Sequence, residues 1–201
     1  MSALEHEYYQ GILDYIRSLP GAAKEAYART LYEWYQVLAD YEAALGGAAN
    51  AAVKLNLGSS DTVLRGFVNV DVVSAPGVEV VDLTKPWPWG DSAVDYVRAS
   101  HIIEHLPDKI FTMNELWRVL KPGSTVDIAV PTTDGPGAWQ DPTHVSFWNR
   151  RSFLYYEDGS PYRESSARSY GITARFRTVR ERIDQTFDGP VLVIALQAVK
   201  P

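Results

Sequence analysis

The sequence predicts an α/β protein with a doubly wound, mostly parallel sheet. Short apolar segments that suit buried strands are each followed by a polar loop or by a helical pattern. Three of these segments lead into Gly58, Asp71 and Asp82, which places small or acidic residues at strand ends. The chain closes with two strand-like segments joined by a turn at 188–190, which predicts an antiparallel strand at the end of the sheet.

Composition excludes several classes of protein. The chain has 201 residues, 46% of them hydrophobic, so one globular domain with a small appendage can form a full core. It has no cysteine, which excludes disulfide scaffolds, thiolate zinc sites and cysteine nucleophiles. A net charge of -6 is unfavourable for binding nucleic acid, and no apolar run approaches the roughly 20 residues of a membrane span. Because the N-terminus lacks a signal pattern, we expect a cytoplasmic protein.

The first 46 residues have a helical pattern. Apolar residues recur every three or four positions on either side of a break at Pro20-Gly21, which predicts a helical hairpin over residues 1–46. Such a hairpin could pack on the main domain, act as a lid, or form the seam of a homodimer. A stretch of small residues follows it, and the main domain is expected over residues 53–201.

Periodicity and turn residues give the elements of that domain. The expected helix covers 110–120, where apolar residues lie at helical spacing and Lys121-Pro122-Gly123 ends the pattern. The expected strands are 53–57, 67–70, 78–81, 93–99, 125–130, 176–183 and 191–199.

The strand ends predict a ligand. In a doubly wound sheet they line one crevice, where glycine allows close backbone approach and an acid can accept both ribose hydroxyls. The segment has no G-x-G-x-x-G pattern, and Gly58 lies only 13 residues before Asp71, against about 20 in dinucleotide-binding folds. That spacing leaves little room for a phosphate-binding helix, so a nucleoside without phosphates is expected.

Several motifs resemble those of class I S-adenosylmethionine-dependent methyltransferases, and most closely the methyltransferase type 11 group. The resemblance covers about residues 53–148. It is carried by Leu55-Asn56-Leu57-Gly58, Gly66-Phe67-Val68-Asn69-Val70-Asp71, Asp82-Leu83, Asp91-Ser92-Ala93-Val94-Asp95, Ser100-His101-Ile102-Ile103-Glu104-His105-Leu106 and Trp117-Arg118-Val119-Leu120-Lys121-Pro122-Gly123. It implies a Rossmann-like sheet of seven strands with an antiparallel last strand, and S-adenosyl-L-methionine as the cofactor.

The resemblance also implies which residues bind the cofactor. Gly58 and its neighbours would approach the methionine portion, Asp71 the ribose, and Asp82 with Leu83 the adenine. Ser59-Ser60 stand where the family usually has a second glycine. The residues expected at the cofactor are Asn56, Gly58, Ser59, Asp71, Val72, Asp82, Leu83, Ser100 and His101.

Methyl transfer from a sulfonium is an in-line displacement, for which a protein mainly supplies orientation and, for a hydroxyl acceptor, a base. His144 follows the fifth expected strand, where the acceptor should lie, and Asp141 three residues earlier could orient its imidazole. His105 is the third candidate catalytic residue. The alternative is that Asp141 merely caps its own loop.

Two other functions remain open. His101 to His105 matches the H-x-x-E-H pattern of a zinc-dependent hydrolase, to which Asp141 or His144 could add a ligand. Methyl transfer itself requires no metal, and none is expected here. The second alternative is a non-catalytic protein that binds S-adenosylmethionine.

The acceptor is expected to be a small molecule, and an arginine-rich C-terminal quarter favours an anionic one. The arginines are Arg150, Arg151, Arg163, Arg168, Arg175, Arg177, Arg180 and Arg182. The alternative is that nearby acids, Glu157, Asp158, Glu164, Glu181 and Asp184, neutralise them at the surface. Trp148, beside Arg150 and Arg151, is a candidate platform for the acceptor.

Overall fold

The structure of the protein is a computed structural model that describes residues 52–60 and 62–200. The predicted helical hairpin 1–46 lies outside the described residues.

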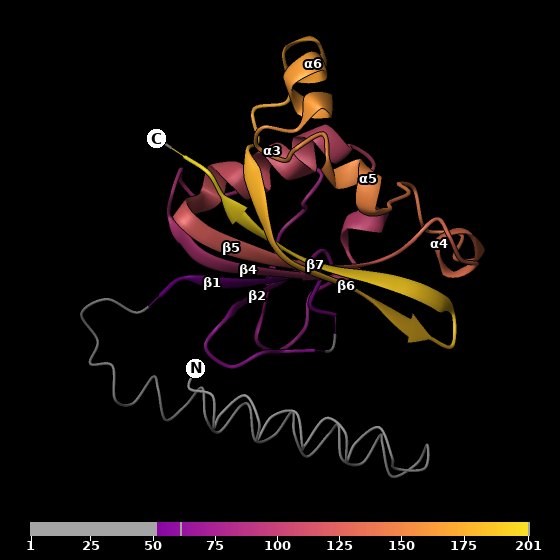
Figure 1. Ribbon diagram of the computed structural model, residues 1–201. Helices are drawn as coiled ribbons and strands as arrows, with labels where there is room; N and C mark the ends of the chain where they lie inside the picture. Colours follow the sequence, from indigo (N-terminus) through magenta and orange to yellow (C-terminus); the bar gives the residue numbers. More distant parts are fainter. Residues whose placement is uncertain (1–51, 61, 201) are drawn as a thin grey trace, which may run out of the picture. The chain divides into compact units, whose positions relative to one another are not determined.

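Seven strands form one mixed sheet, as the resemblance implied (Figure 1). They are β1 (Lys54–Leu57), β2 (Val68–Asp71), β3 (Val78–Val80), β4 (Val94–Ser100), β5 (Leu120–Pro131), β6 (Phe176–Thr186) and β7 (Gly189–Ala198). Their order is β3-β2-β1-β4-β5-β7-β6. β1 pairs in parallel with β2 and β4, whereas β7 runs antiparallel to both β5 and β6. The prediction of a mostly parallel sheet with an antiparallel last strand is therefore confirmed.

The connections differ between the two halves of the sheet. The described residues between β1 and β2, and between β2 and β3, include no helix, in agreement with the short spacing from Gly58 to Asp71. A 3₁₀ turn (Ile103–His105) and helix α3 (Lys109–Val119) connect β4 to β5. The Asp108 carboxylate caps α3 by accepting a hydrogen bond from the Phe111 N–H at 2.9 Å.

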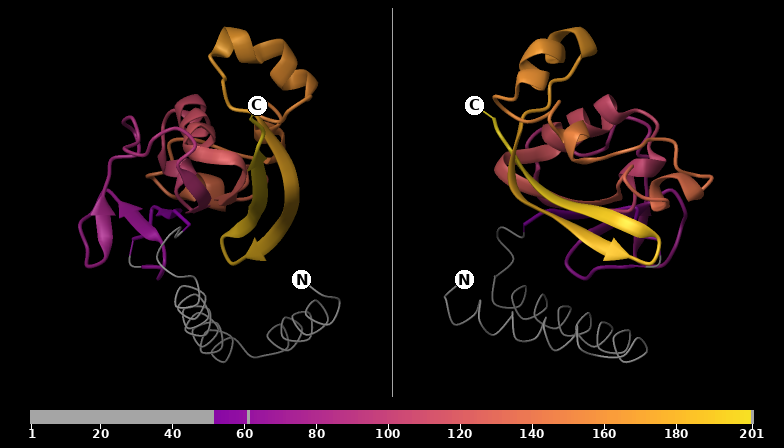
Figure 2. Two further views of the ribbon diagram at one scale, coloured as in Figure 1. Left: turned by 90° about the vertical axis from the view of Figure 1, so that its left-hand side faces the viewer. Right: turned by 45° about the vertical axis from the view of Figure 1, so that its right-hand side comes forward.

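Three further helices lie between β5 and β6: α4 (Gly137–Gln140), α5 (Arg150–Phe153) and α6 (Pro161–Tyr170). Sequence periodicity did not predict them. Helix α6 projects away from the sheet in both views of Figure 2. The long hairpin of β6 and β7 curves along one side of the domain and brings its turn to the end of the sheet where α4 lies (Figures 1 and 2).

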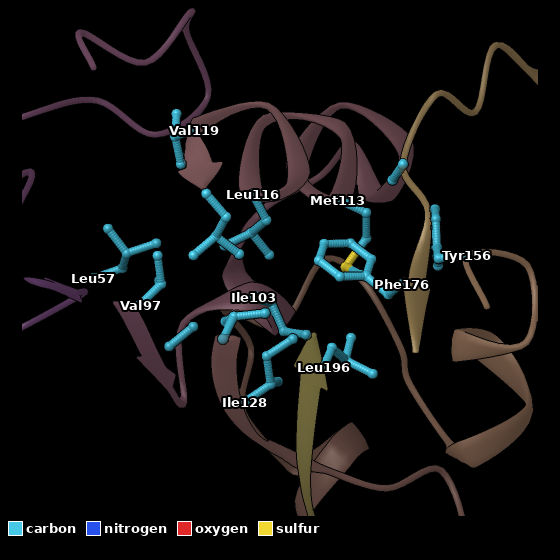
Figure 3. Packing of buried hydrophobic residues seen from close by; sticks show 14 of the residues in the cluster. Leu57, Val97, Ile103, Met113, Leu116, Val119, Ile128, Tyr156, Phe176 and Leu196 are labelled. Carbon is cyan, nitrogen blue, oxygen red and sulfur yellow. The ribbon is translucent and has the colours of Figure 1, made fainter. Parts of the chain in front are cut away.

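The core lies between α3 and the sheet (Figure 3). Met113, Leu116 and Val119 are fully buried on one side of the helix. They face fully buried strand residues that include Leu57, Val97, Ile128 and Leu196. Each buried side chain of this kind contributes about 1.5–3 kcal/mol to folding, so this contact fixes the strand ends on which the site depends.

Arg118 ties α3 to the loop before β4. Its guanidinium donates to Glu115 at 2.6 and 2.8 Å, to Asp91 at 2.8 Å and to the Trp89 carbonyl at 2.8 Å. Glu115 also accepts from the Trp87 N–H at 2.8 Å, and the bonds from Arg118 and Trp87 hold the pKa of Glu115 below its usual range. The arginine of the Trp117-to-Gly123 motif is therefore a structural residue.

Candidate active site

The ends of β1, β2 and β3 form a cleft with a volume of about 170 Å³. We call it the nucleoside cleft. Its lining includes Gly58, Asp71, Val72, Asp82 and Leu83, five of the nine residues predicted at the cofactor. The volume is below the roughly 300–1,000 Å³ typical of drug-sized ligands, so only part of such a ligand fits in the cleft.

Two backbone N–H groups hold the carboxylate of Asp71 in place. Its Oδ2 accepts a hydrogen bond from the Ser60 N–H at 2.8 Å, and its Oδ1 accepts one from the Val73 N–H at 3.0 Å. A carboxylate has about four acceptor positions, so each oxygen can accept one more hydrogen bond. Asp71 is thereby oriented to receive a pair of hydroxyl groups.

Asp82 is held in a similar way by Thr84. Its Oδ1 accepts from the Thr84 N–H at 2.9 Å and from the Thr84 hydroxyl at 2.6 Å. These two bonds, the hydroxyl's first, hold the pKa of Asp82 below its usual value. The other oxygen, Oδ2, is not used by them, so an ionised acceptor remains at the edge of the cleft.

Close backbone packing forms the wall of the cleft at Gly58. Its φ of +61° is in the left-handed region that glycine adopts without strain. A Cβ at this position would lie 2.6 Å from Cγ1 of Ile102, so only glycine lets Ile102 pack here. Ile102 and Leu106 also line the cleft. Sequence reasoning missed both as site residues, although they lie in the same motif as His105.

Four predicted cofactor residues do not line the cleft. Asn56 is buried and its amide is fully used: it donates to Asn69 and to the Thr62 carbonyl, and it accepts from Arg98. Ser59 is also buried, and its hydroxyl makes no hydrogen bond to any described residue. Ser100 and His101 line a different cavity, beside β5 and β6.

A second cavity of about 210 Å³ lies beyond the end of β5. We call it the histidine cavity. It is lined by His101, Glu104, His105, Asp141 and His144, together with residues of the β6–β7 turn. His105 lines the nucleoside cleft as well, so the two spaces meet at its side chain. The structure thus brings the three predicted catalytic residues to one cavity.

Backbone hydrogen bonds hold the two sides of the histidine cavity together. The N–H groups of Val145 and Ser146 both donate to the Glu104 carbonyl at 2.9 Å. The Ser146 hydroxyl donates to the Ile103 carbonyl at 2.9 Å. The 3₁₀ turn after β4 and the loop after α4 are thereby fixed against each other, and His105 and His144 lie with their ring centroids 4.9 Å apart.

The contacts of His144 determine which ring nitrogen carries the proton. Nδ1 lies 3.1 Å from the Ala138 carbonyl oxygen, which can only accept, so Nδ1 donates and Nε2 has the lone pair. Nε2 lies 3.9 Å from Oδ2 of Asp141, longer than a hydrogen bond. The Ala138 carbonyl, and not Asp141, therefore orients His144.

Asp141 instead orients His105, through Thr143. Its Oδ1 accepts from the Thr143 N–H at 2.8 Å and from the Thr143 hydroxyl at 2.6 Å, and these bonds lower the pKa of Asp141. Since the hydroxyl proton of Thr143 is used in this way, its oxygen accepts from Nδ1 of His105 at 3.1 Å. The loop-capping alternative for Asp141 is thus observed, and Nε2 of His105 is left with the lone pair.

The H-x-x-E-H segment does not form the single helix that a zinc hydrolase of that pattern requires. His101 follows β4 with a φ of +53°, and only Ile103–His105 form a short 3₁₀ turn. His101 lies 3.4 Å from Glu104, with its Nδ1 beside Oε1. The two histidines of the motif are therefore not on one helical face.

Acids pair with most of the C-terminal arginines. Ion pairs join Arg150 to Glu157 and Glu181, Arg163 to Glu164, Arg175 to Asp158, Arg180 to Asp127, and Arg182 to Asp184. Among the described residues, no arginine lines the histidine cavity. Trp148 is fully buried, stacks on Phe153 and donates to the Ser146 hydroxyl at 2.9 Å, so its predicted role as an acceptor platform is wrong.

Residues 50–127 match the family model of a methyltransferase domain. No curated protein matches the sequence. No helix among the described residues has the length and apolar character needed to span a membrane.

Solved structures share the fold. A putative methyltransferase in complex with the Haloferax volcanii Trm112 methyltransferase activator is 15% identical with a TM-score of 0.53, over 77% of this chain and 85% of the other. A putative sarcosine dimethylglycine methyltransferase from Galdieria sulphuraria is 16% identical with a TM-score of 0.52, over 88% of each chain. The Burkholderia thailandensis 1,6-didemethyltoxoflavin-N1-methyltransferase, with bound 1,6-didemethyltoxoflavin and S-adenosylhomocysteine, is 15% identical with a TM-score of 0.51, over 91% and 93%.

Proposed function

We propose that this class I S-adenosylmethionine-dependent methyltransferase methylates a hydroxyl group of a small molecule. The observation that carries the proposal is the meeting of the nucleoside cleft and the histidine cavity at His105. One space has the carboxylates that suit a nucleoside, and the other has imidazoles that suit an acceptor with a proton to lose. The small volume of the histidine cavity, about 210 Å³, favours a small acceptor.

The cofactor supplies a methyl group already activated by the positive sulfur. In our proposal Asp71 accepts hydrogen bonds from the two ribose hydroxyls, since each of its oxygens has one acceptor position left. Oδ2 of Asp82 accepts from the adenine amino group, and Leu83 and Ile102 pack on the ring. Residues 53–201 would form this domain, with 1–46 as a lid, packing or dimer element.

His144 is proposed as the general base. Its Nε2 lone pair accepts the proton of the acceptor hydroxyl as that oxygen forms a bond to the methyl carbon. The carbon–sulfur bond breaks, and its electron pair stays on sulfur, which becomes the neutral thioether of S-adenosylhomocysteine. His105, which lines both spaces, is proposed to position the acceptor.

An anionic acceptor is a further part of the proposal, and its support comes from a third cavity. Arg98, Arg180 and Arg182 line it, and it shares His101, Thr186 and Val191 with the histidine cavity. A carboxylate or phosphate on the acceptor would lie there, in competition with Asp127 and Asp184 for Arg180 and Arg182. Its affinity should fall as ionic strength rises.

The test is an acceptor screen that follows release of S-adenosylhomocysteine by the full chain. The panel pairs hydroxylated metabolites that carry a carboxylate or phosphate with their neutral analogues. Release with a charged member, weaker with its neutral analogue and reduced in Arg182→Ala, is the expected result. Cofactor binding with no release for any hydroxylated acceptor would contradict the proposal and favour a protein that only binds S-adenosylmethionine.

A further inference from the structure

We propose that Glu104, His105 and His144 bind a divalent transition-metal ion, zinc first among those to test, in the histidine cavity. The binding of the ion is independent of the proposed function, whereas its part in methyl transfer rests on that function. The proposal departs from the expectation that the site lacks a metal.

The three side chains lie close enough together to share one ion. One carboxylate oxygen and one ring nitrogen from each histidine all lie within 4.8 Å of one another. Backbone hydrogen bonds from Val145 and Ser146 to the Glu104 carbonyl fix the two segments that carry them. Two imidazoles with one carboxylate form the ligand set of catalytic zinc sites, which leave a coordination position open for a water or a substrate.

In both histidines a hydrogen bond at Nδ1 leaves Nε2 as the nitrogen that can bind an ion. Nδ1 of His144 donates to the Ala138 carbonyl, and Nδ1 of His105 donates to Thr143. In each ring Nε2 is therefore the nitrogen with the lone pair. A hydrogen bond from the second ring nitrogen to a carbonyl or polar oxygen is the usual support of a metal-ligating histidine.

The burial of the Glu104 carboxylate is a second, independent observation in favour of an ion in this cavity. The residue is 2% exposed, and neither carboxylate oxygen makes a hydrogen bond to any described residue. The nearest basic group is Nδ1 of His101, at 3.4 Å from Oε1, which is not a hydrogen bond. Buried carboxylates are costly unless they are paired, hydrogen-bonded or bound to a metal. A cation in this cavity would stabilise a buried carboxylate that accepts no hydrogen bond from the described residues.

The ion would change how the acceptor is activated. With Glu104, His105 and His144 as ligands, the ion would supply Lewis-acid chemistry that lowers the pKa of an acceptor hydroxyl bound to it. The proton would then leave to solvent water, the oxygen would form the bond to the methyl carbon, and the electron pair of the broken carbon–sulfur bond would stay on sulfur. His144 is in that case a ligand in place of a base.

The experiment measures zinc binding directly, without an acceptor. The full chain is stripped with a chelator, checked for folding by circular dichroism, and titrated with Zn²⁺ by calorimetry, with elemental analysis of the product. We expect one zinc per chain. Glu104→Gln, His105→Asn and His144→Asn should each weaken binding by at least about 10-fold, the lower end of what loss of a supporting residue costs. Asp188→Asn, in the same cavity, and His6→Asn, a histidine outside the described residues, should bind zinc as the unmodified chain does.

Three results would overturn the proposal: folded chain without stoichiometric zinc, unchanged binding in Glu104→Gln and His144→Asn, or loss of binding in His6→Asn alone. Cofactor affinity is measured on the same samples. Zinc binding without S-adenosylmethionine binding would leave the ion site standing and contradict the proposed function. S-adenosylmethionine binding without zinc binding would contradict the ion site and leave the proposed function standing.

Discussion

The nucleoside cleft and the histidine cavity hold their carboxylates in opposite ways. Asp71 and Asp82 lie at the surface and accept hydrogen bonds from nearby N–H groups, with acceptor positions left over. Glu104 is buried and accepts no hydrogen bond from any described residue. The first arrangement suits neutral donors such as ribose hydroxyls, and the second suits a cation. The two spaces, which share His105 in their lining, therefore differ in electrostatic environment.

The nucleoside cleft and the histidine cavity nevertheless each have the same kind of local turn in their surroundings. In Asp82-Leu83-Thr84 and in Asp141-Pro142-Thr143, the aspartate Oδ1 accepts from the threonine N–H and hydroxyl, with the hydroxyl at 2.6 Å in each. The turns differ in what the threonine oxygen does next. Thr143 accepts from His105, so the turn beside the histidine cavity fixes the His105 imidazole.

The largest expected effect is on turnover, from a substitution in the histidine cavity that leaves the nucleoside cleft intact. His144→Ala should lower turnover by about 10²–10⁴-fold, the usual contribution of a general base, while cofactor affinity stays unchanged. Steady-state kinetics with the identified acceptor, beside calorimetry with S-adenosylmethionine, measure both. Gln185→Ala, at an exposed position of β6, is the control and should keep its turnover. A parallel loss of cofactor affinity in His144→Ala would show that the two regions are not separate.

Asp71→Ala tests the other region. The lost hydrogen bonds to ribose should cost about 1.5–3 kcal/mol each, or roughly 10- to 150-fold in affinity for S-adenosylmethionine per bond. Asp71→Asn keeps one acceptor oxygen and should lose less. Calorimetry on both variants is the measurement, and an affinity equal to that of the unmodified chain would remove Asp71 from the site.

Gly58→Ala should destabilise the wall of the nucleoside cleft. The new Cβ would meet Ile102 at 2.6 Å, an overpacking that costs about 1–3 kcal/mol in addition to the strain of a positive φ. Gly66→Ala is the matched control, because Gly66 has a φ of +76° and nothing within 4 Å of the added Cβ. Urea unfolding should therefore give Gly58→Ala the lower stability of the two. Equal losses would mean that Ile102 moves aside without cost.

The smallest expected effect concerns pH. Because the Thr84 hydroxyl is the first cause of the lowered pKa of Asp82, Thr84→Val should raise that pKa toward the usual value. Binding that needs ionised Asp82 is present above its pKa and is lost as the pH falls through it, so in Thr84→Val the loss begins at a higher pH. Carboxyl NMR titration and cofactor affinity across acidic pH give the two readouts. Thr143→Val should raise the pKa of Asp141 without moving the pH dependence of cofactor binding.

Much of the sheet could be predicted, because its parallel strands are short apolar runs that end in glycine or acid and its last two strands flank a recognisable turn at 188–190. The last two strands were expected at 176–183 and 191–199, and they lie at Phe176–Thr186 and Gly189–Ala198. Helix α6 was missed because its sequence is mostly polar and has no apolar stripe. Pro161 at its start and Gly171 at its end, with a φ of +72°, are signals that could have located it.

The nucleoside cleft was more predictable than the histidine cavity for a physical reason. Its acids follow neighbouring strands directly, so local sequence places them. The histidine cavity depends on hydrogen bonds between segments about 40 residues apart in the sequence, such as the bond from Val145 to Glu104. The periodicity of a single sequence does not predict such bonds. The prediction for Asn56 was wrong for a different reason. This residue belongs to a motif that suggested cofactor binding, but its side-chain amide makes all its hydrogen bonds to other residues of the protein.

The contact of the two spaces at His105 has a consequence for kinetic order. In the proposed reaction the methyl group passes directly from the cofactor to the acceptor, and no side chain carries it in a covalent intermediate. Both substrates must then be present together, and double-reciprocal plots at several cofactor concentrations should intersect instead of running parallel. A single displacement also inverts the configuration of a chirally labelled methyl group, whereas two successive transfers would retain it.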